Sequence, residues 1–222
     1  MFVILTLIAS ELYFFKKRST ISDHVKKCEK TIPKIIVLDG NIGAGKTTFL
    51  KALSRITNIS IELEPVEEFL HPINLLELAY TDPYLSQKGF NDIMIRQMKT
   101  ILSKHSGRDY IIMERGLYSC EMFTNVAYQR GKLTLSEKDA LMQQIQDGYR
   151  AMNLPPIPSA FVYLDTAANQ CIRNIRKRNR KGKERIDIDF LQLLEQEQRQ
   201  HISKQANVLA LKLSDMELFN HE

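Results

Sequence analysis

Short apolar segments alternate with longer, more polar segments along most of the chain. The apolar segments are rich in β-branched residues, and we expect them to be buried strands at residues 34–38, 59–63, 110–113, 160–164 and 208–213. The intervening stretches predict helices at residues 45–56, 73–80, 90–105, 117–129, 136–152, 167–178 and 187–204. This alternation predicts an α/β fold, in which a parallel sheet of about five strands is flanked by helices on both faces.

The start of the chain differs from the rest. Residues 1–15 are mostly apolar and a basic cluster follows at 16–18, but Glu11 interrupts the run, which is shorter than the ~20 residues of a membrane-spanning helix. The segment lacks the basic start and cleavage site of a secretory signal, and it is too acidic and too poor in Arg and Ser for a transit peptide. We expect a leader over residues 1–33, packed on the domain or disordered and not a membrane anchor, and one domain over residues 34–222.

Charge and cysteine content narrow the class of protein. The net charge of +5 suits an anionic substrate such as ATP as well as it suits nucleic acid. The basic residues are concentrated between Arg173 and Arg185 without interleaved aromatic residues, which argues against a nucleic-acid surface. The three cysteines (Cys28, Cys120 and Cys171) are far apart and form no metal-binding pattern, so we expect reduced packing residues in a cytoplasmic protein.

A phosphate-binding loop follows the first predicted strand. The sequence matches the pattern G-x-x-x-x-G-K-[ST] and stands between a strand and a helix, as that motif requires. The glycines let backbone amides point at phosphate oxygens, the lysine reaches the β- and γ-phosphates, and the next hydroxyl can bind Mg²⁺. The residues that we expect to bind ATP here are Gly40, Asn41, Ile42, Gly43, Ala44, Gly45, Lys46, Thr47 and Thr48.

Acidic residues follow two later strands. Glu114 and Arg115 come directly after the strand at 110–113, so Glu114 could order Mg²⁺ beside Thr47 and Arg115 could stabilise the transferring phosphate. Glu64 follows the strand at 59–63, at the edge of the sheet where α/β proteins bind ligands. On the residues alone, Glu64 is one of four neighbouring glutamates and is not singled out.

These motifs together resemble the deoxynucleoside kinases. The similar segments are residues 40–48 (GNIGAGKTT), 64–67 (EPVE), 74–83 (NLLELAYTDP) and 113–115 (MER). The resemblance extends over about residues 34–215 and implies a P-loop kinase fold with a basic lid. That family includes the deoxycytidine, deoxyguanosine and mitochondrial thymidine kinases and, more distantly, the herpesviral thymidine kinases.

The resemblance implies a role for each motif. Glu64 would be the general base that accepts the proton of the nucleoside 5′-hydroxyl, Arg115 would hold the reacting phosphate, and Lys46 would bind ATP. Arg176, Arg178 and Arg180 would close over the phosphates as a lid, since a helix would not place all three on one face. The lid is most similar to that of the herpesviral enzymes, which makes Glu184 a candidate for the sugar 3′-hydroxyl, with Lys183 as the alternative.

The resemblance also implies a base pocket. Phe69 and Phe90 would form its aromatic walls, and Asn91 stands where relatives carry the glutamine that pairs with the base. Asn91 is one methylene shorter, and Gln97 would replace it only in a rotated helix. Met98 and Cys120 stand where cytidine- and purine-specific relatives carry Arg and Asp, and this uncharged pair favours thymidine, with deoxycytidine or deoxyuridine also tolerated. The full set of substrate-binding residues implied is Phe69, Leu76, Tyr80, Phe90, Asn91, Met98, Arg115, Cys120 and Glu184.

We therefore expect an ATP- and Mg²⁺-dependent deoxynucleoside kinase that acts on thymidine in nucleotide salvage. The expected enzyme is a cytoplasmic homodimer that binds neither nucleic acid nor a membrane. One alternative is a thymidylate kinase, although no second basic cluster is evident for an acceptor phosphate. Another is a non-catalytic subunit with the same fold, although such a subunit would be expected to lose Lys46, Glu64 or the lid arginines.

Overall fold

A computed structural model describes residues 32–55, 57–178, 185–204 and 207–212. Apart from Ile32 and Pro33, the expected leader lies outside the described residues, as do the lid candidates Arg180 and Glu184. Within the described ranges, no helix is long and apolar enough to cross a membrane.

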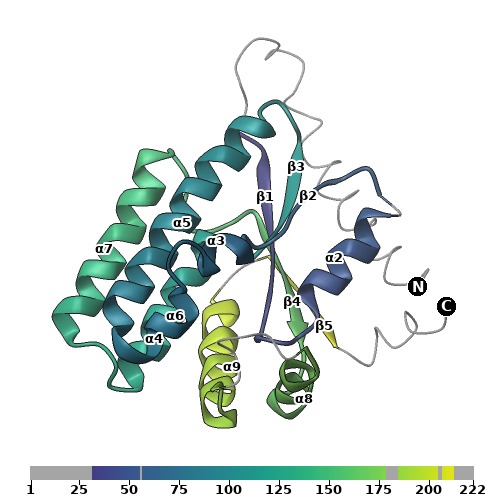
Figure 1. Cartoon of the computed structure of the whole chain (residues 1–222). Coiled ribbons are helices and arrows are strands. Elements are labelled where there is room, and N and C mark those ends of the chain that lie inside the picture. Colours follow the sequence, from purple (N-terminus) through teal and green to yellow (C-terminus); the bar gives the residue numbers. More distant parts are fainter. Residues whose placement is uncertain (1–31, 56, 179–184, 205–206, 213–222) are drawn as a thin grey trace.

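Five parallel strands form one sheet at the centre of the molecule (Figure 1). Their spatial order is β2-β3-β1-β4-β5, so β1 is in the middle and each neighbouring pair is parallel. The strands are β1 (Lys34–Gly40), β2 (Ser60–Glu62), β3 (Tyr110–Glu114), β4 (Ala160–Asp165) and β5 (Val208–Lys212). This arrangement confirms the predicted α/β fold.

Helices cover both faces of the sheet because both faces of the central strand are apolar. Ile35 and Val37 of β1 pack in one buried cluster with α5, α6 and α7, whereas Ile36 and Leu38 pack in a second cluster with α2 and α8. The helices are α2 (Lys46–Ser54), α3 (Val66–Leu70), α4 (Leu75–Thr81), α5 (Pro83–Lys104), α6 (Leu117–Gln129), α7 (Leu135–Ala151), α8 (Ala168–Arg178) and α9 (Ile188–Ser203).

The observed elements match the predicted ones except at two places. The short helix α3 was not expected, and α5 begins at Pro83 rather than at residue 90. Proline suits the first turn of a helix, and the Asp82 side chain accepts a hydrogen bond from the backbone amide of Leu85 at 2.9 Å. This cap starts α5 early and brings its first turns beside the candidate site.

Candidate active site

The loop between β1 and α2 brings its backbone close to two other segments. Gly40, Gly43 and Gly45 have positive φ angles of 149°, 84° and 97°. A Cβ atom at Gly43 would lie 2.6 Å from the carbonyl oxygen of Cys171, and one at Gly40 would lie 2.8 Å from that of Leu164. Glycine is needed here because the backbone conformation and the close packing both exclude a side chain. The N-terminus of α2 follows directly and adds its positive dipole.

Lys46 lies inside this loop. It is 5% exposed, and its Nζ donates to the carbonyl oxygens of Gly40 and Asn41, both at 2.9 Å. Burial, and then the nearby charge of Arg115, lowers the pKa of Lys46 to about 8. Asn41 is anchored in turn, since its Nδ2 donates to the carbonyl oxygen of Leu191 in α9 at 2.8 Å. The loop therefore holds a buried amine beside backbone amides, which suits the binding of phosphate oxygens.

Thr47, the residue after Lys46, contacts Glu114 at the end of β3. The Thr47 hydroxyl donates to the Glu114 carboxylate and lies 2.9 Å from both of its oxygens. These are the hard oxygen donors that Mg²⁺ prefers, and Mg²⁺ usually takes one or two carboxylates together with substrate phosphates. Among the described residues, no cluster of three or more His, Cys, Asp or Glu side chains could hold a metal by itself. The two residues therefore fit a metal ion that is held mainly by phosphate.

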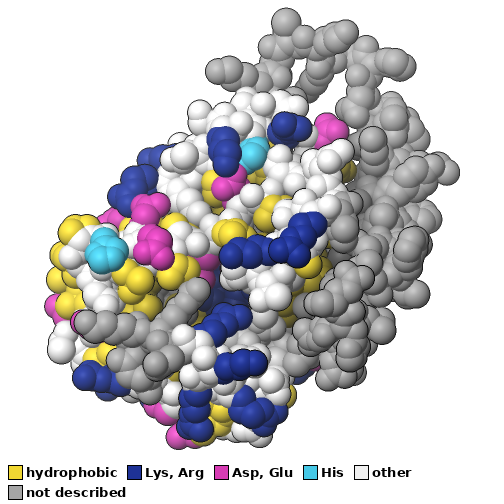
Figure 2. Space-filling model, turned by 45° about the vertical axis from the view of Figure 1, so that its right-hand side comes forward, with side chains coloured by type: hydrophobic (Ala, Val, Ile, Leu, Met, Phe, Trp, Pro, Cys, Tyr) yellow, Lys and Arg dark blue, Asp and Glu magenta, His cyan; other side chains and the backbone are white. Residues whose placement is uncertain are grey.

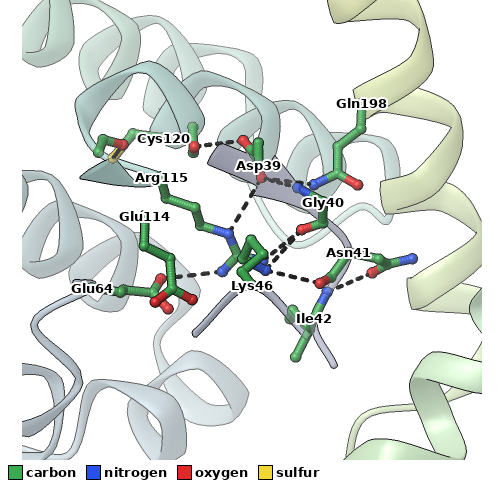
Figure 3. Close-up of polar contacts among 12 residues, drawn as sticks. Asp39, Gly40, Asn41, Ile42, Lys46, Glu64, Glu114, Arg115, Cys120 and Gln198 are labelled. Carbon is green, nitrogen blue, oxygen red and sulfur yellow. Dashed lines mark hydrogen bonds and ion pairs between the residues drawn. The ribbon is translucent and has the colours of Figure 1, made fainter. Parts of the chain in front are cut away.

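Arg115 connects the loop to Glu64 (Figure 3). Its Nη1 donates to Oε1 of Glu64 at 3.1 Å, and its Nη2 donates to the carbonyl oxygen of Gly40 at 3.2 Å. Burial disfavours its charge, but the carboxylates of Glu64, Asp39 and Glu114 outweigh burial and raise the pKa of Arg115. Four side chains from three distant segments thus converge at the carboxyl edge of the sheet, where α/β folds bind ligands.

A cavity of about 390 Å³ opens beside Glu64 and Arg115. Its volume lies in the range of small-molecule pockets. The rings of Phe69 and Phe90 meet edge to face in its wall, with centroids 4.8 Å apart. The exposed Tyr80 also lines it, with the Arg185 guanidinium 5.2 Å from the centre of its ring. Other lining residues are Ile42, Leu76, Gln87, Met94, Cys120 and Phe123.

Phe90 of α5 lines the cavity as expected, but the amide and the methionine of α5 that line it are not the expected ones. Gln87 and Met94 line it, whereas Asn91 and Met98, both fully buried, are not among the described lining residues. Asn91 Nδ2 donates instead to Oε1 of Gln144 in α7 at 3.0 Å. Gln87 and Met94 each stand four positions before the expected amide and methionine. The amide and the methionine at the cavity are therefore displaced by about one helical turn from the positions that the resemblance implied.

Contacts between α4 and α5 explain this displacement. The Ser86 hydroxyl donates to the carbonyl oxygen of Leu75 at 2.8 Å, and a Cβ at Gly89 would lie 2.8 Å from a methyl group of Leu75. These contacts fix the rotation of α5 so that Gln87 faces the cavity. Gln97, considered above as a substitute for Asn91, donates to the backbone carbonyl of Leu63 at 3.0 Å. One signal in the sequence could have identified Gln87, because it is a second amide side chain four residues before Asn91.

Two of the three arginines expected to form a lid lie at the end of α8. Arg176 and Arg178 are exposed in its last turn, and Arg180 and Glu184 lie outside the described residues. Figure 2 shows several Lys and Arg side chains in the lower part of the molecule, where Figure 1 places α8 and α9. Lys132 and Arg130 also line the cavity together with Arg185. Arg130, Lys132 and Arg185 thus come together at the cavity, although no cluster of these three residues was evident from the sequence.

The chain is similar to one protein family and to several individual proteins. The model of the deoxynucleoside kinase family matches residues 36–222. A thymidine kinase of Ictalurid herpesvirus 1 (strain Auburn) is 30% identical over 166 residues, covering 72% of this chain and 70% of the relative. The human protein "Thymidine kinase 2, mitochondrial" is 28% identical over 175 residues, covering 76% of this chain and 64% of the relative.

Relatives with other substrates in their names are also similar. A deoxyguanosine kinase of Dictyostelium discoideum is 27% identical over 191 residues, covering 80% of this chain and 63% of the relative. The comparisons therefore leave the acceptor base open. The family match extends over well more than half of the sequence and includes the phosphate loop, Glu64 and Arg115. The chain belongs to the deoxynucleoside kinase family.

Proposed function

We propose that the protein transfers the γ-phosphate of ATP to the 5′-hydroxyl of a deoxynucleoside, and that thymidine is its preferred acceptor. The observation that carries this proposal is the ion pair between Arg115 and Glu64, at 3.1 Å, between the phosphate loop and the cavity. It supports a carboxylate base beside the acceptor and a fixed cation beside the transferring phosphate.

Each residue has a distinct task in this reaction. The loop amides and Lys46 bind and neutralise the phosphates of ATP. Glu64 accepts the proton of the 5′-hydroxyl, and Arg115 stabilises the charge that develops on the transferring group. Thr47 and Glu114 would hold a Mg²⁺ ion, which when bound neutralises charge on the β- and γ-phosphates. Arg176 and Arg178 stand at the end of α8, from which a lid could reach the same phosphates.

The cavity lining supports a pyrimidine acceptor that carries a methyl group. Gln87 Nε2 donates one N–H to Oδ1 of Asn91 at 3.2 Å, which leaves its second N–H and its carbonyl oxygen for a base edge. Phe69 and Phe90 offer aromatic surface for the ring. Met94 and Cys120 are uncharged neighbours of that space. Burial raises the pKa of the Cys120 thiol, so this side chain stays neutral. A neutral apolar wall accommodates the methyl group of thymine.

One observation favours a second acceptor. Arg130, Lys132 and Arg185 all line the cavity, although Arg130 is paired with Asp187 at 2.8 Å. Such charges would attract the phosphate of a thymidine monophosphate and would make the protein a thymidylate kinase. A phosphoryl-transfer assay that offers ATP with thymidine, the other deoxynucleosides and thymidine monophosphate tests the proposal against this alternative.

A further inference from the structure

Asp39 is a buried carboxylate that has no part in the reaction described above. It precedes Gly40 near the end of β1, its side chain is 0% exposed, and it is not among the described residues that line the cavity. A buried charge is costly unless it is paired and hydrogen-bonded. The partners of Asp39 therefore indicate what this carboxylate does.

Asp39 gathers donors from four segments of the chain (Figure 3). Its Oδ1 accepts from the backbone amide of Gly40 at 2.7 Å and from Nε2 of Gln198 at 3.2 Å, and its Oδ2 accepts from the hydroxyl of Ser119 at 2.7 Å. Arg115 Nε lies 3.5 Å from Oδ1, which makes an ion pair rather than a hydrogen bond. The phosphate loop, α6, α9 and the turn after β3 thus meet at one carboxylate.

Two carboxylates hold the Arg115 side chain from different edges of its guanidinium group. Glu64 accepts from Nη1 at 3.1 Å, and Asp39 faces Nε at 3.5 Å. The backbone of Arg115 has a φ of 59°, a conformation that persists in a residue other than glycine only where the surroundings fix it. Without the charge of Asp39, the guanidinium would keep Glu64 and the carbonyl oxygen of Gly40 as partners of its Nη atoms, but its Nε would face no carboxylate.

We propose that Asp39 is a positioning residue that fixes the direction of the Arg115 side chain and, through it, the place of Glu64 beside the phosphate loop. It acts through Arg115 and does not contact the substrate. The inference rests on the proposed function, because Asp39 is useful in this way only if Arg115 and Glu64 carry out the reaction. It goes beyond the phosphate-loop motif, because Asp39 stands outside the pattern that defines the motif.

The first test compares Asp39→Asn with Asp165→Asn. Asp165 ends β4, the parallel neighbour of β1, but it pairs with Arg199 on the surface instead of with Arg115. Because misplacing a catalytic group by about 1 Å can cost ~100-fold in rate, we expect Asp39→Asn to lower kcat about 10- to 100-fold. The KM values for ATP and thymidine should change less than about threefold, since the residue touches neither. Asp165→Asn should leave the kinetics unchanged.

A double-mutant cycle separates positioning from a general structural role. If Asp39 acts through Arg115, Asp39→Asn should lower kcat by less than about threefold in an Arg115→Gln background. An effect as large in that background as in the wild type would overturn the inference. A kcat for Asp39→Asn equal to that of Asp165→Asn would overturn it as well.

A second variant covers the case in which Asp39→Asn does not fold. Gln198→Met removes one hydrogen bond to Asp39 and leaves the charge of Asp39 in place. Gln198 belongs to α9 and is not among the described residues that line the cavity. We expect a kcat about 3- to 10-fold lower, with the loss again absent in the Arg115→Gln background. An unchanged kcat would overturn the inference while the proposed function stands. A wild-type protein that phosphorylates no nucleoside would instead reject the proposed function, and the inference with it.

Discussion

The Arg115 guanidinium binds Glu64 at 3.1 Å and the carbonyl oxygen of Gly40 at 3.2 Å, so it joins the candidate base directly to the phosphate loop. Gly40 is the last residue of β1, and Glu64 and Arg115 follow β2 and β3 of the same parallel sheet. Their carboxyl ends meet at one edge, which is how residues far apart in the sequence reach a common site. In our account, phosphoryl transfer takes place at this junction.

Glu64→Gln should lower kcat at least ~100-fold, because an amide cannot accept the proton of the 5′-hydroxyl. The KM for thymidine should change little, since the substitution keeps size and shape. Glu68→Gln is the matched control, because Glu68 lies on the surface and pairs with the exposed Arg96 at 2.6 Å. Initial-rate measurements on the two variants check this prediction, and a near-normal rate for Glu64→Gln would remove Glu64 from the role of base.

Gln87→Leu should raise the KM for thymidine about tenfold, which corresponds to the loss of one base-pairing interaction of roughly 1.4 kcal/mol. Asn91→Leu should instead lower the unfolding temperature by several degrees, because both Gln144 in α7 and Nε2 of Gln87 lose their contact with the buried Asn91 amide. Any rise in the KM for thymidine in this variant should therefore come together with that loss of stability. Steady-state kinetics and thermal unfolding of both variants separate the two roles. The assignment would be wrong if Asn91→Leu impaired thymidine binding without loss of stability and Gln87→Leu did not.

Gly43→Ala and Gly107→Ala test the close packing of the phosphate loop. Both glycines have nearly the same φ, 84° and 83°, but only the Gly43 position lies against another atom, the Cys171 carbonyl oxygen at 2.6 Å. Gly107→Ala should therefore cost only the ~1–2 kcal/mol of a left-handed backbone, measured as the free energy of unfolding. Gly43→Ala should cost more and should also weaken ATP binding at least ~10-fold. Equal effects of the two substitutions would show that the loop does not need this packing.

Glu62 should stabilise the fold in a pH-dependent way. Its Oε1 accepts hydrogen bonds from Lys104 and His105 at the end of α5, both at 2.6 Å. Burial opposes the charge of Glu62, but these two partners outweigh it, so its pKa lies below the ordinary 4.5. A lowered folded-state pKa adds stability that is present above the ordinary value and is lost as the pH falls through the folded value.

Glu62→Gln should therefore lower the free energy of unfolding by roughly 1–2 kcal/mol at neutral pH. The difference from the wild type should shrink as the pH falls below 4.5. Urea unfolding over a pH series measures this difference, with Glu68→Gln as an exposed control. A difference that stayed constant into the acid range would contradict the assigned ion pair.

Much of the fold could be predicted from the sequence, because strands with two apolar faces and intervening helices leave few other arrangements. The apolar run predicted as a strand at residues 34–38 lies within β1, which continues to Gly40, and the phosphate loop follows it as its spacing predicts. The start of α5 was missed because it depends on the Asp82 cap and on Pro83, not on an apolar pattern.

The site was less predictable where it depends on how helices pack. Which face of α5 lines the cavity is set by Ser86 and Gly89 against Leu75, a contact between separate helices that no local pattern reveals. For this reason, Gln87 and Met94 line the cavity instead of Asn91 and Met98. Asp39 was overlooked because it stands just outside the loop motif, although an acid at the end of a buried apolar strand was a signal for it.

The most direct test of the central claim is a phosphoryl-transfer assay on the purified full-length protein. It offers ATP and Mg²⁺ with thymidine, deoxyuridine, deoxycytidine, deoxyadenosine, deoxyguanosine or thymidine monophosphate, with Lys46→Ala as the inactive control. Our account predicts that thymidine has the highest kcat/KM and that the product is its 5′-monophosphate. Phosphorylation of thymidine monophosphate alone, or of no acceptor in the panel, would contradict it.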